Sequence, residues 1–252
     1  MPSDRPLGQP VPGWTPPPWP GPMRLDGRWL RLDPLTPAHA PALFAANRAD
    51  DRVWDYLPYG PFADEAAYRA WVGSVAGKAD PLFFALTDRA VGTPAGVASL
   101  MRINPDAGSI EVGHICLSPQ IQRTRAASEM VFLLAEWVFR EGWRRFEWKC
   151  DALNRPSRRA AERFGFSFEG VFRQHLIVKG RNRDTAWFAM TDGDWRCPPA
   201  ASKFAGSSRS QRPSRRIGPG QGGGVHPGTG WPSGRSEGMG PRSAPVRRSP
   251  PS

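Results

Sequence analysis

The sequence predicts a mixed α/β fold in which helices flank a largely antiparallel sheet. Three apolar segments before residue 118 are separated by short turns, which is the pattern of consecutive hairpins. One long amphipathic helix follows them, and a strand, a short helix and two more strands complete the order. A doubly wound fold would alternate strands and helices throughout. The element order therefore favours a mixed sheet with antiparallel ends.

The first elements lie before residue 77. Residues 29–32 alternate enough for a strand. Pro37 begins a helix with apolar-periodic positions at Ala40, Leu43, Phe44 and Asn47. A turn-rich loop occupies residues 55–61. Asp64 is placed to cap a second helix that continues to about residue 76.

The middle of the chain predicts three consecutive strands. Residues 81–86 form a short apolar run, and residues 95–103 pair back on it after a turn at residues 91–94. A second turn at residues 104–108 leads to residues 109–117, which we expect to be a central strand.

The strongest helix signal follows, and Gly142 ends it. Its apolar stripe consists of Ala127, Met130, Val131, Leu134, Trp137 and Val138. Residues 146–150 then predict a strand, and a short helix opens at Asn154 with Pro156 in its first turn. Residues 166–178 and 185–191 complete the antiparallel end of the sheet, joined through Gly180.

Charge and low-complexity composition are concentrated at the two ends of the chain. The formal net charge is +11, and residues 201–252 hold nine Lys and Arg against one Glu. The same stretch contains 11 Gly, 8 Pro and 10 Ser, and nine prolines lie in residues 1–23. We therefore expect a Pro-rich arm at 1–23, a globular domain at 24–195 and a disordered basic tail at 196–252.

Several classes of protein do not fit this composition. No run of 18 apolar residues occurs, and we expect no secretory signal and no membrane span. Cys116, Cys150 and Cys197 are too few for a disulfide framework, and neither their spacing nor the four scattered histidines predict a metal site. We expect a cytoplasmic protein that binds no metal.

Residues 117–128 connect the central strand to the long amphipathic helix. A helix N-terminus has unpaired backbone N–H groups and a positive dipole end, which together suit a pyrophosphate. Arg123 and Arg125 lie at this point and add positive charge. The alternative for both arginines is a solvated helix face.

A second motif begins about thirty residues later, at Asn154. The two motifs together resemble those of the GNAT acetyltransferase superfamily, and more narrowly of its RimJ/RimL-type branch. The family's acetyl-CoA loop reads Gln/Arg-x-x-Gly-x-Gly/Ala, and its later helix reads Asn-x-x-Ser-x-x-x-x-Glu-(basic)-x-Gly-Phe. The positions that fall on these patterns are Gln122, Arg125, Ala127, Asn154, Ser157, Glu162, Arg163, Gly165 and Phe166. The resemblance covers about residues 24–192.

The resemblance implies that acetyl-CoA is bound as a co-substrate. The residues expected to hold it are Ile115, Cys116, Leu117, Gln122, Arg123, Thr124, Arg125, Ala126, Ala127, Asn154 and Ser157. A backbone N–H within residues 115–117 would stabilise the thioester oxygen, and the pantetheine arm would run between this strand and residues 146–150. Arg125 departs from the pattern, because it replaces a glycine that lets the backbone approach the phosphates. We expect binding to be retained, and the alternative is a scaffold with weakened affinity.

Three side chains are candidates for proton transfer. Glu111 lies on the strand before the loop, where many family members carry an acid that acts through water; alternatively it faces solvent or pairs with Arg102. His114 lies three positions on, so only a bulge would turn it to the face of Glu111, and otherwise it is a packing residue. Ser157 is expected to protonate the leaving sulfur, or instead to cap its helix.

The acceptor site is expected beside the loop at residues 55–61. The residues expected to bind the acceptor are Tyr56, Tyr59, Trp148, Arg173 and His175. Asp151, Arg183 and Asp184 are further candidates for the opposite wall. The alternatives are a core role for Trp148 and a structural ion pair between Arg183 and Asp184.

The leading hypothesis is an N-acetyltransferase that moves acetyl from acetyl-CoA to a primary amine, on a small molecule or a protein N-terminus, by direct attack in a ternary complex. One alternative is a ribosome- or RNA-associated protein whose basic tail makes salt-dependent phosphate contacts. Another is a non-catalytic protein of the same fold that binds acyl-CoA. The sequence leaves the oligomeric state open, with a homodimer as one option.

Overall fold

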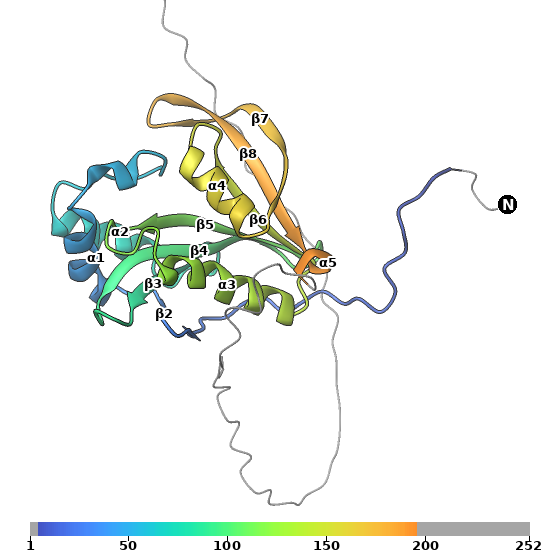
Figure 1. Cartoon of the computed structure of the whole chain (residues 1–252), viewed down its shortest axis with the longest axis horizontal. Helices are drawn as coiled ribbons and strands as arrows, with labels where there is room; N and C mark the ends of the chain where they lie inside the picture. The colour runs from blue at the N-terminus through green and yellow to red at the C-terminus, as the bar shows by residue number, and fades with distance from the viewer. Residues whose placement is uncertain (1–4, 196–252) are drawn as a thin grey trace, which may run out of the picture. The chain divides into compact units, whose positions relative to one another are not determined.

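The computed structural model describes residues 5–195, whose strands form one eight-stranded sheet in the order β1-β2-β3-β4-β5-β6-β8-β7 (Figure 1). The strands are β1 Leu25–Asp26, β2 Leu30–Pro34, β3 Leu82–Asp88, β4 Pro94–Asn104, β5 Ser109–Leu117, β6 Arg145–Asp151, β7 Ser167–Val178 and β8 Arg181–Thr191. All neighbours pair antiparallel except β5 and β6, which are parallel. The predicted mixed fold with a largely antiparallel sheet is confirmed. The tail predicted at residues 196–252 lies outside the described residues.

The helices follow the predicted order. They are α1 Ala40–Asn47, α2 Glu65–Val75, α3 Arg125–Arg140, α4 Arg155–Arg163 and α5 Asp192–Trp195, with 3-10 helices η1 Pro37–His39 and η2 Asp51–Trp54. Asp64 caps α2 as predicted, because its carboxylate accepts a hydrogen bond from Ala67 N at 2.8 Å. The short elements β1, η2 and α5 were not predicted, since none is long enough to show a periodicity. Within residues 5–195, no helix is long and apolar enough to cross a membrane.

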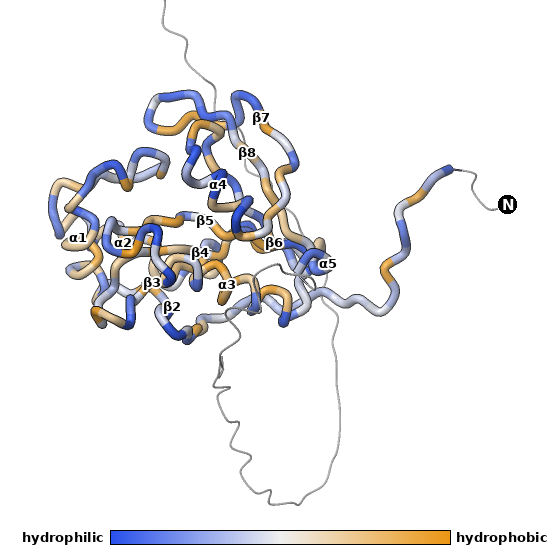
Figure 2. Tube along the Cα trace, in the orientation of Figure 1, coloured by the Kyte–Doolittle hydropathy of each residue, from blue (hydrophilic) through white to orange (hydrophobic). Residues whose placement is uncertain are grey.

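Two apolar cores lie on opposite faces of the sheet. In the α3 core, α3 and α4 pack against β2, β5, β6 and β8, and in the α1 core, α1 and α2 pack against β3 and β4. Figure 2 shows hydrophobic residues along the central strands and α3, whereas α4 is mostly hydrophilic. β3 contributes to both, with Leu82, Phe84 and Leu86 in the α3 core and Phe83 and Ala85 in the α1 core. Burial on both faces explains its continuous apolar sequence.

Glu129 fixes the start of the sheet to α3. Its side chain is buried and accepts backbone hydrogen bonds from Arg28 N at 2.7 Å, Trp29 N at 2.7 Å and Leu30 N at 2.8 Å. A carboxylate that accepts several N–H groups is well solvated without water. The contact therefore ties the entry of β2 to the helix that begins at the predicted phosphate loop.

β5 pairs with β4 along most of its length but loses its pairing with β6 part-way along, and this opens the middle of the sheet. It pairs with β6 only over residues 109–112. Its pairing with β4 is interrupted by a bulge between Gly113 and Cys116, where His114 adopts a φ of 50°. Beyond Val112, the edge of β5 that faces β6 has no strand partner among the described residues. Backbone groups on this edge are therefore free of strand pairing, although Leu117 O accepts a hydrogen bond from Gln122 Nε2 at 2.9 Å.

Candidate active site

A cavity of about 960 Å³ lies where β5 and β6 separate. It extends from the loop before α3 and the first turns of α4 to η2 and the β7–β8 hairpin. Its lining includes Tyr56, Arg102, Glu111, His114, Ile115, Leu117, Gln122, Arg123, Ala127, Trp148, Lys149, Asn154, Ser157, His175 and Arg183. The cavity thus brings together the two motifs and most of the predicted site residues.

The predicted phosphate loop forms the start of α3. Thr124 caps the helix, since its hydroxyl accepts from Ala127 N at 3.3 Å and donates to Ile121 O at 2.7 Å. Arg123 adopts a φ of 60° and lines the cavity. The guanidinium of Arg125 instead lies over the ring of Trp29, 5.6 Å from its centroid. Arg123, rather than Arg125, is therefore the loop arginine beside the cavity.

The second motif places Ser157 in the first turn of α4. Asn154 is the helix cap, because its side-chain oxygen accepts from Ser157 N at 3.1 Å. The capping role considered for Ser157 is therefore wrong. The Ser157 hydroxyl accepts from Trp148 Nε1 at 3.0 Å, lines the cavity, and also has a side-chain hydrogen bond with the Cys150 thiol. Trp148 is buried in the α3 core, as its alternative interpretation proposed.

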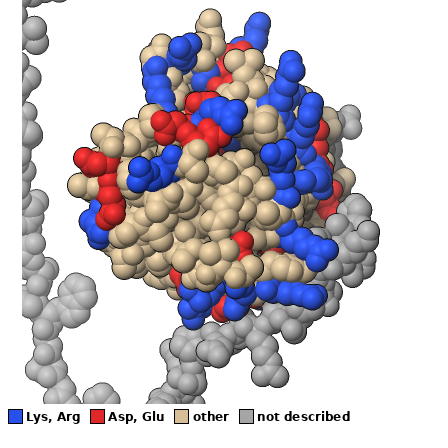
Figure 3. All heavy atoms as spheres, turned by 60° about the vertical axis from the view of Figure 1, so that its left-hand side comes forward, with Lys and Arg blue, Asp and Glu red and all other residues tan. Residues whose placement is uncertain are grey.

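Arginines border the end of the cavity near α3 and α4. Arg159 and Arg163 on α4 join Arg123 in the lining. Figure 3 turns the α1 and α2 side of the molecule forward, and there Lys and Arg side chains are most numerous at the right of the face. Basic side chains at a helix N-terminus favour phosphate groups.

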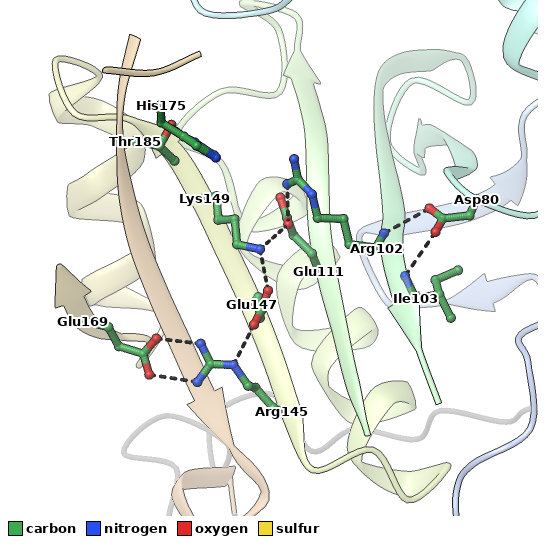
Figure 4. Close-up of polar contacts among 10 residues, drawn as sticks. All are labelled: Asp80, Arg102, Ile103, Glu111, Arg145, Glu147, Lys149, Glu169, His175 and Thr185. Atoms are coloured by element: carbon green, nitrogen blue, oxygen red, sulfur yellow. Dashed lines mark hydrogen bonds and ion pairs between the residues drawn. The ribbon is translucent and has the colours of Figure 1, made fainter. Parts of the chain in front are cut away.

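On the other side of the sheet, charged side chains form a row across three strands (Figure 4). Glu111 on β5 and Lys149 on β6 are each 4% exposed, and Lys149 Nζ lies 3.0 Å from Glu111 Oε2 and 2.6 Å from Glu147 Oε2. Arg145 continues the row from Glu147, at 2.7 Å, to Glu169 on β7, at 2.6 Å. Lys149 also lies 3.7 Å from the ring centroid of Trp187. Sequence reasoning missed Lys149, because a single lysine in an alternating strand reads as solvent-facing.

Glu111 is a buried, paired carboxylate and not a solvent-facing one. Arg102 donates from Nη1 to Oε2 at 2.8 Å, so the ion pair considered in the sequence does form, together with the one to Lys149. Both cations bind Oε2. Neither cation contacts the other oxygen, Oε1, which is therefore the oxygen left to accept a proton.

His114 lies on the same side of the sheet as Glu111, because the bulge turns it there. Its ring stacks on Tyr59 with centroids 5.6 Å apart and contacts Phe83 at 5.0 Å. Burial, with the charges of Arg102 and Arg183, lowers the pKa of His114 to about 4. The ring is therefore neutral at pH 7.

Backbone strain is concentrated around the cavity. Non-glycine residues with positive φ are Arg102, His114, Arg123, Gln174 and Lys179, and the first three line the cavity. Two carboxylates accept backbone hydrogen bonds at two of these residues. Asp80 accepts from Arg102 N at 3.0 Å and Ile103 N at 3.2 Å, as Figure 4 shows, and Asp184 accepts from Gln174 N at 2.7 Å. Such strain is typical of functional sites, and periodicity in the sequence cannot reveal it.

The predicted acceptor residues divide between the cavity and its surroundings. Tyr56 lines it and His175 lies beside it, with Nδ1 2.9 Å from Thr185 Oγ1. Tyr59 is packed among Trp54, Phe62 and Trp71, and its hydroxyl is buried. Arg173 is exposed on β7 and outside the lining.

The β7–β8 hairpin and η2 are joined across the acceptor end. Lys179 Nζ donates to Trp54 O at 2.8 Å. Tyr56 Oη lies 3.4 Å from Leu153 O, at the opposite rim. These contacts connect three segments that are far apart in the sequence.

Neither thiol in the described chain is suited to covalent catalysis. Cys116 and Cys150 are both free and buried. Burial raises the pKa of Cys116 to about 12, so its thiol stays protonated at neutral pH. No group of three His, Cys, Asp or Glu residues within 5–195 could hold a metal ion. The site offers acid–base groups and backbone donors.

Comparisons with known proteins identify the family. The acetyltransferase (GNAT) domain family matches residues 30–167. A GCN5-related N-acetyltransferase from Brucella melitensis is 47% identical, with a TM-score of 0.72, over 74% of this chain and 86% of that chain. A probable GNAT-family acetyltransferase from Chromobacterium violaceum is 38% identical, with a TM-score of 0.72, over 78% of this chain and all (100%) of that chain. The chain belongs to the GNAT acetyltransferase family.

A more distant structure shows the same fold. The Microcin C7 self immunity acetyltransferase MccE, solved in complex with acetyl-CoA and AMP, is 18% identical, with a TM-score of 0.60, over 66% of this chain and 93% of that chain. None of the curated proteins matches the sequence.

Proposed function

We propose that the protein is an N-acetyltransferase that moves acetyl from acetyl-CoA to a primary amine by direct attack in a ternary complex. One observation carries the proposal. A single cavity joins the unpaired edge of β5, with arginines at one end, to the buried carboxylate of Glu111 at the other. Two substrates can therefore meet at β5 from opposite sides of the sheet.

The residues around the open edge fit acetyl-CoA. The N-terminus of α3 and the side chain of Arg123 would hold its pyrophosphate. The edge of β5 beyond Val112, which has no pairing with β6, would pair with the amides of the pantetheine arm, and one N–H there would face the thioester oxygen. Gln122 steadies this edge, since its Nε2 donates to Leu117 O at 2.9 Å.

Two side chains divide the proton transfers. The amine nitrogen forms a bond to the acetyl carbon as the carbon–sulfur bond breaks. Glu111 takes the proton released by the amine, through a water molecule at Oε1. Ser157 supplies a proton to the departing sulfur, since its hydroxyl already accepts from Trp148. His114 stays neutral and forms the wall beside the acceptor.

Calorimetry with acetyl-CoA and a CoA-release assay with a panel of amines test this function. We expect acetyl-CoA binding and release of CoA only when an amine is present. Binding without release by any amine would favour the non-catalytic acyl-CoA-binding alternative. Absence of binding would contradict the proposal altogether.

Two variants test the proton transfers. Glu111→Gln should lower kcat about 100-fold or more, the usual contribution of a general base, without changing acetyl-CoA binding. Ser157→Ala should lower kcat, and the loss should be smaller for acetyl donors whose departing thiol is a good leaving group than for donors with a poor one. Glu141→Gln, an exposed change at the end of α3, is the matched control and should leave kcat unchanged. An unchanged kcat in Glu111→Gln would exclude Glu111 as the base.

Three finer assignments are also proposals. The RimJ/RimL-type branch is supported by the register of the α4 motif from Asn154 to Phe166. A reducing cytoplasmic setting is supported by the two free thiols. The RNA-binding alternative depends on a basic tail that lies outside the described residues, so the enzyme is the function that the structure supports.

A further inference from the structure

Arg183 on β8 has no ion-pair partner among residues 5–195. Its side chain lines the acceptor end of the cavity, and its Nε is buried without a hydrogen-bond partner. The ion pair with Asp184 considered in the sequence is not formed, because Asp184 accepts from Gln174 N at 2.7 Å and Asn182 Nδ2 at 3.0 Å. No other ion pair of Arg183 occurs within residues 5–195. Leaving a guanidinium partly desolvated and unpaired is costly.

Arg183 faces the reacting groups. In β8, Thr185 and Trp187 lie on the side of the sheet where Lys149 packs on Trp187, and alternation along the strand places Arg183 on that side too. The charge of Arg183 also reaches His114, whose pKa it helps to lower. The free guanidinium therefore lies beside the wall where the acceptor amine must enter.

The carboxylate nearest to the reaction is already neutralised. Glu111 has two cationic partners, Arg102 and Lys149. At the rim, Asp50 is paired with Arg52, and Asp55 is exposed. A purely cationic acceptor would leave Arg183 without an ion-pair partner, whereas an acceptor that carries its own negative charge would pair with it.

We propose that the acceptor is a small amine that carries a carboxylate close to its amino group, as a free amino acid does, and that Arg183 binds this carboxylate. A planar guanidinium matches a carboxylate in bidentate geometry. The cations around the site also favour the neutral form of the amine, which is the form that attacks. This inference rests on the proposed acetyl transfer.

The contact between the β7–β8 hairpin and η2 favours a small molecule over a protein chain. Lys179 and Trp54 join the β7–β8 hairpin to η2 over this end of the cavity. A polypeptide acceptor would have to enter beneath this contact, and its terminal residue would offer no free α-carboxylate to Arg183. A free amino acid avoids both difficulties.

Matched acceptors test the proposal. Leucine, phenylalanine and serine are each compared with the corresponding carboxamide and with the corresponding decarboxylated amine. The quantity measured is the KM for the acceptor, because these changes also alter the pKa of the amine and therefore kcat. Loss of one charge-assisted hydrogen-bonded contact should raise KM about 10- to 100-fold for the amides and amines. Equal or lower KM values for the compounds that lack the carboxylate would overturn the proposal.

The variant Arg183→Gln locates the contact. It should raise KM for the free acids about 10-fold or more and leave KM for the amides, and for acetyl-CoA, unchanged. Arg183→Lys should restore part of the effect. Arg181→Gln, the same change at an exposed residue of the hairpin, is the control. A preference for the acids that survives in Arg183→Gln would show that another group binds the carboxylate.

Binding of the products separates this inference from the proposed function. If no amine is acetylated, calorimetry with N-acetyl-leucine and N-acetyl-leucinamide, in the presence of CoA, still measures the carboxylate contact. Tighter binding of the acid that is lost in Arg183→Gln would support the site without turnover. Equal binding of both compounds would contradict the site, whatever the activity of the enzyme.

Discussion

The two faces of the sheet at β5 and β6 bury opposite kinds of side chain. The α3 side buries Ile110, Val112, Phe146, Trp148 and Cys150. The residues between them point to the other side, where Glu111, Glu147 and Lys149 form a row of ion pairs. Strands of one sheet thus combine an apolar face with a charged face that is almost equally excluded from water.

The difference separates stability from chemistry. Apolar burial stabilises the fold at roughly 25 cal/mol per Å² of surface. A buried ion-pair row contributes little net stability, because desolvation of the charges offsets their attraction. The charged face is therefore explained by what it holds in place, which is the carboxylate of Glu111 beside the open edge of β5.

The largest expected effect is on the apolar face. Phe146→Ala removes a ring that is 0% exposed and should lower the free energy of unfolding by about 3–5 kcal/mol. Urea denaturation measures this loss. Ile177→Ala, at a side chain 82% exposed on β7, is the control and should change stability by less than about 0.5 kcal/mol. Equal losses in the two variants would mean that the α3 core is not the main source of stability.

The charged face should respond differently to single and combined changes. Lys149→Met leaves two carboxylates side by side, with Arg102 still paired to Glu111 and Arg145 to Glu147, and should cost about 2 kcal/mol, less than the roughly 3–5 kcal/mol of a fully unpaired buried charge. Adding Glu111→Gln and Glu147→Gln should return stability to within about 1 kcal/mol of the natural chain, but not the activity.

Urea denaturation of the single and triple variants, with kcat for each, checks this prediction. A triple variant that stays as unstable as Lys149→Met would show that the row is a net source of stability. In that case the contrast between the two faces would fail.

His114 links the charged face to pH. Its folded pKa of about 4 lies below the unfolded value of 6.5, so the unfolded chain binds the proton first as the pH falls. The contribution of His114 to the free energy of unfolding is fully present above about pH 7 and is lost as the pH falls from about 6.5 to 4. From pH 7 to 5 the natural chain should lose about 2 kcal/mol more than His114→Phe, which keeps the ring contacts. Parallel losses in both chains would show that His114 is not buried in its neutral form.

Most of the fold could be predicted, because its elements leave clear local signals. The stripe of α3 and the cap at Asp64 appear directly in residue spacing. The parallel pairing of β5 with β6, and the insertion of β8 between β6 and β7, could not be predicted. Strand order depends on contacts between segments far apart in the chain, and spacing within a segment carries no information about them.

The site was predicted in part, for a similar reason. Glu111, Asn154 and Ser157 follow from motifs, and the structure places all three on one cavity. The burial of Lys149 and the free guanidinium of Arg183 follow from the sheet order and could not be predicted. Asp184 was assigned to the wrong partner, because neighbours in sequence point to opposite faces of a strand.

The smallest expected effect distinguishes the two arginines at the start of α3, on the apolar side of the sheet. Arg123 lines the cavity and Arg125 lies over Trp29, although the sequence motif singles out Arg125. Arg123→Leu should raise KM for acetyl-CoA about 10-fold, the value of one charge-assisted phosphate contact. Arg125→Leu should change this KM less than about twofold and cost about 0.5–1 kcal/mol of stability through the lost ring contact. A larger KM effect of Arg125→Leu than of Arg123→Leu would mean that Arg125 leaves Trp29 when acetyl-CoA binds. In that case the position in the motif, and not the geometry of the free chain, would identify the arginine that contacts the phosphate.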